Sequence, residues 1–184
     1  MSHAHDLSPS PWIVRFASLV SAGARLLDLA AGNGRHARFF AERGAQVLAV
    51  DRDADTLSTL AHVANVETRV LDLETGVWPL AGKRFDAIVV TNYLHRPLFR
   101  HLREALLPDG LLLYETFAVG NEAYGRPSNP DFLLKRDELL RLASLPPEPL
   151  TIVAFEQGST RRAVVQRLAA VGPGRPWPPP LPIE

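Results

Sequence analysis

Three aspartates and a glycine-rich loop are the residues whose types and spacing could do chemistry together. Asp28 lies inside a short apolar run, Asp51 and Asp72 end the next two apolar runs, and Gly32-Asn33-Gly34 follows the first run. Glycines between a strand and a helix let the backbone approach a ligand closely. Open α/β sheets bind ligands at the carboxyl ends of their strands. The pattern therefore predicts a site for a nucleoside that carries positive charge.

Two nucleoside cofactors compete for such a site. Gly32, Gly34 and Ala37 match the G-x-G-x-x-G/A pattern of dinucleotide-binding proteins, and Asp51 stands where a ribose-binding acid belongs. A dinucleotide would bring its pyrophosphate to the start of the helix, where the Asp28 carboxylate would repel it unless it pointed away. S-adenosylmethionine carries a sulfonium and an ammonium group instead, and an acid favours both. We therefore expect S-adenosylmethionine.

These runs resemble, in order, the motifs of class I S-adenosylmethionine-dependent methyltransferases. LLDLAAGNGRHARFF is similar to the first motif, VLAVDRD and RVLDLE to the second and third, FDAIVVTNYLHRPLF to the fourth, and LLPDGLLLYETF to the fifth. The resemblance covers residues 25–117. Within the superfamily, GNGRHAR and NYLHRPLF are similar to compact small-molecule enzymes of the tellurite-resistance type. The set of motifs is typical of the superfamily and is not specific to a substrate.

The resemblance implies a cofactor contact for each position that matches these motifs. The methionine portion would be lined by Asp28, Ala30, Gly32 and Gly34, and the ribose by Asp51 and Arg52. The adenine would lie beside Asp72 and Leu73, and the methyl end beside Thr91 and Asn92. Many nucleic-acid amino methyltransferases carry Asn-Pro-Pro-Tyr/Phe in the fourth motif. Asn92-Tyr93 lacks the prolines, which argues against a base amine as the methyl acceptor.

The residues after the fourth apolar run are the candidates for catalysis. His95 could act as a general base, because imidazole titrates near neutral pH, or it could cap or pack the following helix. Tyr93 is the second catalytic candidate, and Arg96 could hold an anionic substrate or be solvated. A base is needed only if the nucleophile still carries its proton.

A glycine- and proline-containing segment, residues 118–132, is predicted to form a long loop or lid. Polar and aromatic residues in such loops often bind ligands, so Tyr124 and Arg126 are predicted to contact the substrate. The alternative is a surface loop fixed by its glycines and prolines. The wider set of candidates comprises Glu115, Thr116, Phe117, Asn121 and Asn129. No metal site is expected.

The elements that must position these residues alternate along the chain. Apolar runs predict strands at residues 26–30, 46–50, 66–71, 86–91 and 111–117. Helices are predicted at residues 10–22, 35–43, 53–63, 97–107 and 135–145. Two last strands, 150–156 and 161–168, would form an antiparallel hairpin joined at Gly158-Ser159. The expected fold is α/β: a Rossmann-like, doubly wound, mostly parallel seven-stranded sheet with an antiparallel C-terminal hairpin.

Length and composition narrow the remaining choices. The 184 residues predict one domain, 1–171, and a proline-rich tail, 172–184, that is either simply extended or a ligand for an aromatic groove. Twenty basic and 20 acidic residues leave no net charge, so nucleic-acid binding is not expected. The absence of cysteine, of a signal-peptide pattern and of a bilayer-length apolar run predicts a cytoplasmic protein with no membrane partner. We expect it to be a monomer or a homodimer.

The sequence thus predicts methyl transfer from S-adenosylmethionine to a small-molecule substrate. Three alternatives stay open: a methyltransferase acting on RNA or protein, an NAD-dependent oxidoreductase, and a noncatalytic methyltransferase-like partner subunit that presents its proline tail. Preferential binding of NADH would support the second alternative, and failure to bind any cofactor would support the third.

Overall fold

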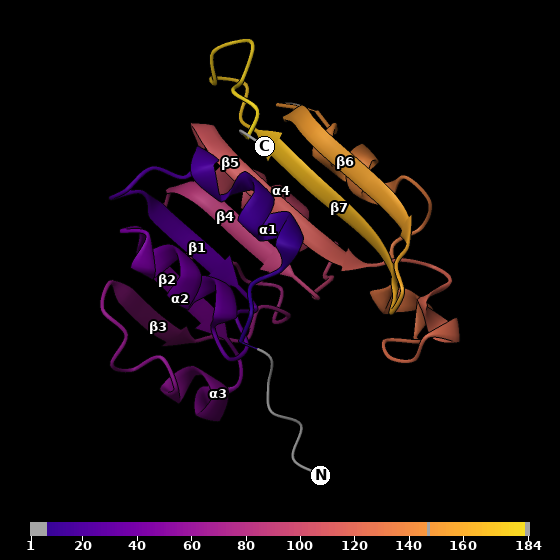
Figure 1. Cartoon of the computed structure of the whole chain (residues 1–184), viewed down its shortest axis with the longest axis horizontal. Coiled ribbons are helices and arrows are strands. Elements are labelled where there is room, and N and C mark those ends of the chain that lie inside the picture. The colour runs from indigo at the N-terminus through magenta and orange to yellow at the C-terminus, as the bar shows by residue number, and fades with distance from the viewer. Residues whose placement is uncertain (1–6, 147, 183–184) are drawn as a thin grey trace.

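The computed structural model describes residues 7–146 and 148–182, and within them a single sheet organises the chain (Figure 1). Seven strands follow the order β3-β2-β1-β4-β5-β7-β6. The strand β7 is antiparallel to both of its neighbours, and every other adjacent pair is parallel. The strands are β1 (Arg25–Leu29), β2 (Gln46–Asp51), β3 (Val66–Val70), β4 (Phe85–Thr91), β5 (Leu106–Phe117), β6 (Thr151–Ser159) and β7 (Val164–Val171). The predicted α/β fold is confirmed.

Helices cover both faces of this sheet. Successive strand side chains point to opposite faces, so Leu26 and Leu27 belong to two different hydrophobic cores. The core that contains Leu26 packs against α1 (Pro11–Phe16), α2 (Arg35–Glu42) and α3 (Ala54–Ser58). The core that contains Leu27 packs against α4 (Leu98–Ala105) and α5 (Glu138–Ala143). Figure 1 shows α1 and α2 in front of the sheet.

The helices are shorter than predicted. The Ser10 hydroxyl caps α1 by accepting a hydrogen bond from the Trp12 N–H at 3.2 Å. Helix α1 ends at Phe16, and a 3-10 turn follows it. Helix α3 ends at Ser58 instead of reaching residue 63. The Ser58 and Thr59 hydroxyls donate to the backbone carbonyls of Asp55 and Thr56, and such local bonds favour turns over continued helix.

Two irregular connections shape the C-terminal part of the sheet. Pro108-Asp109-Gly110 lies inside β5, where Phe85 pairs with Leu106 and Ala87 pairs with Leu111, so the intervening residues form an irregular insertion in the strand. The Gly172 N–H donates to the Gly110 carbonyl at 2.9 Å and ties the end of β7 to this insertion. The β6–β7 turn lies at residues 160–163, where the Thr160 hydroxyl accepts two backbone N–H groups, instead of at Gly158-Ser159.

The proline-rich tail follows β7 on the surface of the molecule. Beyond β7 the side chains of Trp177 and Leu181 are exposed on the proline-rich tail. No helix in residues 7–146 and 148–182 is both long and apolar enough to cross a bilayer.

Candidate cofactor site

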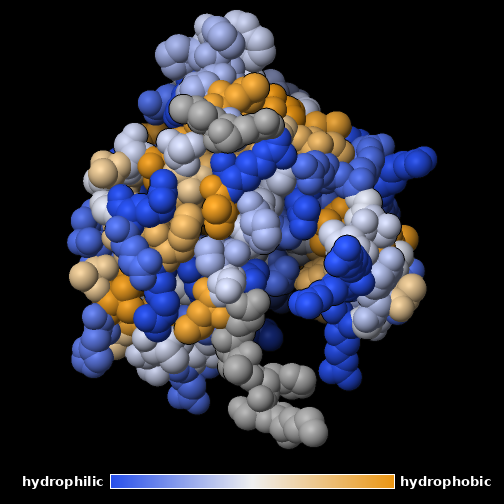
Figure 2. Space-filling model, in the orientation of Figure 1, coloured by the Kyte–Doolittle hydropathy of each residue, from blue (hydrophilic) through white to orange (hydrophobic). Residues whose placement is uncertain are grey.

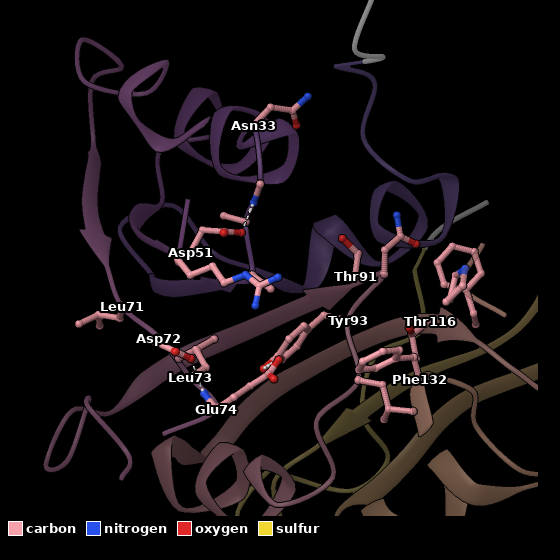
Figure 3. A pocket seen from close by; sticks show the side chains of 18 of the residues that line it. Asn33, Asp51, Leu71, Asp72, Leu73, Glu74, Thr91, Tyr93, Thr116 and Phe132 are labelled. Carbon is pink, nitrogen blue, oxygen red and sulfur yellow. Dashed lines mark hydrogen bonds between the residues drawn. The ribbon is translucent and has the colours of Figure 1, made fainter. Parts of the chain in front are cut away.

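A cavity of about 580 Å³ opens at the carboxyl ends of β1 to β5 (Figure 3). The same surface is hollowed beside the loop that follows β5 (Figure 2). In Figure 3, Asp51 and Asp72 approach the space from one side, and Thr116 and Phe132 from the other. The lining residues are Ala30, Ala31, Gly32, Asn33, Arg35, Asp51, Arg52, Leu71, Asp72, Leu73, Glu74, Thr91, Asn92, Tyr93, Leu94, Thr116, Phe117, Pro127 and Phe132.

The Asp51 carboxylate is held in a fixed orientation at this cavity. One oxygen accepts the Gly32 N–H at 2.8 Å and the other accepts the Asp53 N–H at 3.0 Å. Each carboxylate oxygen can accept a second hydrogen bond. The sequence places Asp51 here because it is the last residue of β2, and Arg52 lines the cavity beside it. A fixed carboxylate with spare acceptor capacity suits a pair of neighbouring hydroxyl groups.

The two loop glycines serve different purposes. Both adopt a positive φ, +54° at Gly32 and +72° at Gly34, which disfavours other residues. A Cβ on Gly32 would meet no protein atom within 4 Å, so the space beside it stays open to the cavity. A Cβ on Gly34 would lie 2.4 Å from the Leu60 side chain. Gly34 does not line the cavity, and its role is to let the loop pack against Leu60.

Asp28 is buried beneath the glycine loop and does not line the cavity. Burial raises the pKa of Asp28 to about 7, partly offset by a hydrogen bond from the Ala37 backbone and by the positive charge of Arg35. One of its carboxylate oxygens has no hydrogen-bond partner among the described residues. Asp28 lies under the start of α2, and its direct contact with the cofactor stays a prediction. Because Asp28 is not among the lining residues, a pyrophosphate in the cavity would not meet its carboxylate on the cavity surface.

Acidic and aromatic groups follow β3 and β4. Asp72 accepts the Glu74 N–H at 2.9 Å through one oxygen, and Leu73 beside it is buried. The Tyr93 hydroxyl donates to Glu74 at 3.3 Å, which connects the segments after β3 and β4 across the cavity wall. Burial and the Glu74 charge raise the pKa of Tyr93. Tyr93 is therefore a hydrogen-bond donor at neutral pH, and a role as general base does not fit it.

Thr91 and Asn92 both line the cavity, as the sequence predicts. Asn92 has a φ of +55° at the end of β4, a conformation that asparagine tolerates better than most residues. The Thr91 hydroxyl lies 3.3 Å from Nδ1 of His36, a buried residue of α2 that the sequence reasoning missed. The one available signal was its position inside the GNGRHAR run.

His95 and Arg96 do not line the cavity. His95 is half-buried in the turn before α4, where its carbonyl accepts the Leu98 N–H at 3.0 Å. The Arg96 guanidinium forms an ion pair with Glu138 at 2.6 Å and donates to the carbonyls of Asp131 and Leu133. Arg96 thus braces the long loop against α5, and its guanidinium is not directed toward a substrate.

The long loop contributes to the site through other residues than those predicted. Tyr124 and Arg126 are exposed and lie outside the lining, whereas Pro127 and Phe132 of the same loop line the cavity. Thr116 and Phe117, from the wider set of candidates, line it as well. Asn33, Arg35, Glu74 and Leu94 were missed, although each adjoins a predicted motif residue. No group of three metal-ligating side chains occurs in the part of the chain that the structure describes.

The fold and the cavity define an open α/β domain with a nucleoside-sized site at the carboxyl edge of its parallel strands. A family model described as a methyltransferase domain matches residues 26–110. YqeM of Bacillus subtilis (strain 168), a provisionally named methyltransferase, is 32% identical over 126 residues, which cover 62% of this chain and 50% of YqeM. The chain thus spans about half the length of this curated relative.

Solved structures share the fold. TehB from Haemophilus influenzae superposes with a TM-score of 0.75 at 16% identity, covering 89% of this chain and 62% of TehB. A TehB-like SAM-dependent methyltransferase from Corynebacterium glutamicum gives a TM-score of 0.62 at 19% identity, covering 88% of this chain and 86% of that one. These likenesses show that the chain shares the fold of these methyltransferases, and the family model adds a methyltransferase-domain match over residues 26–110.

Proposed function

We propose that this protein binds S-adenosylmethionine in the cavity and transfers its methyl group to a small molecule. The observation that carries the proposal is the Asp51 carboxylate, which two backbone N–H groups hold at the cavity. Asp51 would accept hydrogen bonds from both ribose hydroxyls, and Asp72 from the adenine amine. Leu73 would pack on the adenine, and Gly32 would leave room for the methionine portion.

The chain's own part in the reaction is positioning. The bound cofactor supplies a methyl group that its sulfonium sulfur has already activated. Asp51 and the glycine loop would fix the nucleoside, while Thr91 and Asn92 would bound the methyl end. Thr116, Phe117 and Phe132 would hold the acceptor in line and exclude water. Correct alignment of two reactants by itself lowers the barrier of such a transfer substantially.

The choice of a small-molecule acceptor rests on three features. Pro127 and Phe132 of the long loop give one side of the cavity an apolar lining. The sequence has no net charge, whereas RNA binding generally needs a basic excess. The Asn92-Tyr93 pair lacks the prolines that many base-amine methyltransferases carry. We further infer a cytoplasmic location, with which the lack of cysteine agrees, and a monomeric or homodimeric state.

Isothermal titration with S-adenosylmethionine, S-adenosylhomocysteine and NADH tests the cofactor. Micromolar affinity for both sulfur nucleosides and none for NADH is the expected result. Binding of NADH alone would replace the proposal with an oxidoreductase, and binding of none of the three would favour a noncatalytic subunit. Once binding is established, release of S-adenosylhomocysteine with a panel of small amines and thiols, with RNA and with protein as comparison acceptors, tests the substrate class.

A further inference from the structure

His36 is a buried ionisable residue to which the proposed reaction gives no part. Its side chain lies in the first turn of α2 and is 1% exposed. The Ser10 backbone N–H donates to His36 Nε2 at 3.1 Å, and His36 Nδ1 lies 3.3 Å from the Thr91 hydroxyl oxygen. The ring therefore connects the start of α1 to a residue that lines the cavity.

The direction of both hydrogen bonds follows from the chemistry of the partners. A backbone N–H can only donate, so Nε2 must offer its lone pair to Ser10. A neutral imidazole with an unprotonated Nε2 carries its proton on Nδ1, which then donates to Thr91. Burial lowers the pKa of His36 to about 3, so the ring is neutral at physiological pH. Thr91 accepts this bond through a lone pair, and its own hydroxyl proton stays available.

Ser10, whose backbone N–H sets the tautomer of His36, is itself held in place. The Ser10 hydroxyl donates to the Glu115 carboxylate and accepts the Trp12 N–H, so Ser10 is tied to both β5 and α1. Ser10 is 6% exposed, and water does not compete readily for its backbone N–H. Among the described residues, His36 is the one side chain that hydrogen-bonds to the Thr91 hydroxyl.

We propose that His36 is a positioning residue that directs the Thr91 hydroxyl proton into the cavity, where it donates to an acceptor group of the bound nucleoside. The ligand group that Thr91 meets is then a hydrogen-bond acceptor, such as a carboxylate or a ring oxygen. The identity of the nucleoside rests on the proposed function. The tautomer of His36 and the orientation of the Thr91 hydroxyl do not depend on the proposed function.

A set of matched variants separates positioning from packing. His36→Asn retains an N–H near the position of Nδ1, whereas His36→Gln retains an acceptor near Nε2 and loses the donor to Thr91. We expect His36→Gln to weaken the affinity for S-adenosylhomocysteine by about three- to tenfold, the usual effect of one hydrogen bond. His36→Asn should stay within about twofold of the wild type, since it preserves that bond. Thermal unfolding of each variant reports the packing contribution separately.

The coupling to Thr91 is measured by a double-mutant cycle. Thr91→Val should weaken binding as His36→Gln does, Thr91→Ser should not, and the double variant should bind no more weakly than Thr91→Val alone. An equal loss from His36→Gln in the wild-type and Thr91→Val backgrounds would overturn the proposal. So would an Nε2–H tautomer of wild-type His36 in long-range ¹H–¹⁵N spectra, a measurement that needs no ligand. A wild-type protein that binds neither sulfur nucleoside refutes the proposed function instead.

Discussion

Replacing Asp28 by asparagine should make the protein more stable, increasingly so as the pH rises. The carboxyl is buried beneath the glycine loop, and burial raises its pKa from 3.8 to about 7. The folded state therefore holds the Asp28 proton over a pH range in which the unfolded chain has released it. Stability from this group is greatest below the unfolded pKa and is lost as the pH rises toward the folded pKa. Asparagine has nearly the same shape and no charge to desolvate.

The size of the effect follows from the two pKa values. Each pH unit between 3.8 and about 7 costs the wild type roughly 1.4 kcal/mol of unfolding free energy. Between pH 5 and pH 8 the Asp28 contribution should thus fall by about 2–3 kcal/mol. The Asp28→Asn variant lacks this pH-dependent contribution to the unfolding free energy. The difference in stability between variant and wild type should therefore grow by that amount across the interval.

Urea unfolding of both proteins, followed by circular dichroism at several pH values, measures the difference directly. All histidines are common to the two proteins, so their titration cancels where it is independent of Asp28. A difference that stays constant from pH 5 to pH 8 would refute the assigned burial of the carboxyl. Titration with S-adenosylhomocysteine in the same buffers decides whether Asp28 also contributes to cofactor affinity from below the loop.

Three further outcomes follow from the site. Asp51→Ala should weaken S-adenosylhomocysteine binding by about 1–3 kcal/mol through lost ribose hydrogen bonds, whereas Asp55→Ala on the exposed side of α3 should leave the dissociation constant unchanged in calorimetry. Gly34→Ala should lower the unfolding free energy by about 1–3 kcal/mol more than Gly32→Ala, because both strain a positive φ and only the first overlaps Leu60; equal losses in urea would contradict this. His95→Ala should keep its turnover once an acceptor is known, and a loss of more than about tenfold would restore His95 as a catalytic base.

The sequence was sufficient to predict the sheet and the acids at its carboxyl edge. Parallel strands end at one edge, so Asp51 and Asp72, as strand-end residues, had to lie near each other. Asp28 differs because it lies one residue before the end of β1, between Leu27 and Leu29, and its buried side chain is not among those that line the cavity. The same strand register that places Asp51 correctly could have placed Asp28 beneath the loop.

The long loop and the hydrogen bonds to distant residues were beyond prediction for a physical reason. Residues 118–132 have no periodic pattern, so nothing in the sequence distinguishes Phe132, which lines the cavity, from the exposed Tyr124. Arg96 is engaged by Glu138, which lies 42 positions away in the sequence. Ser10 and His36 are 26 positions apart. Such pairs depend on tertiary packing, which local propensity and spacing do not encode.

Asp28 and His36 together show how groups under the glycine loop balance one another. Burial raises the pKa of Asp28 and lowers that of His36, and each shift favours the neutral form. The Asp28 term lowers stability as the pH rises from 3.8 to about 7, whereas the His36 term raises stability from about pH 3 to 6.5. Because the slopes oppose one another, their sum is nearly flat between about pH 4 and pH 6.5 in the wild type. Asp28→Asn leaves the histidine term uncompensated, so its stability should rise over that interval.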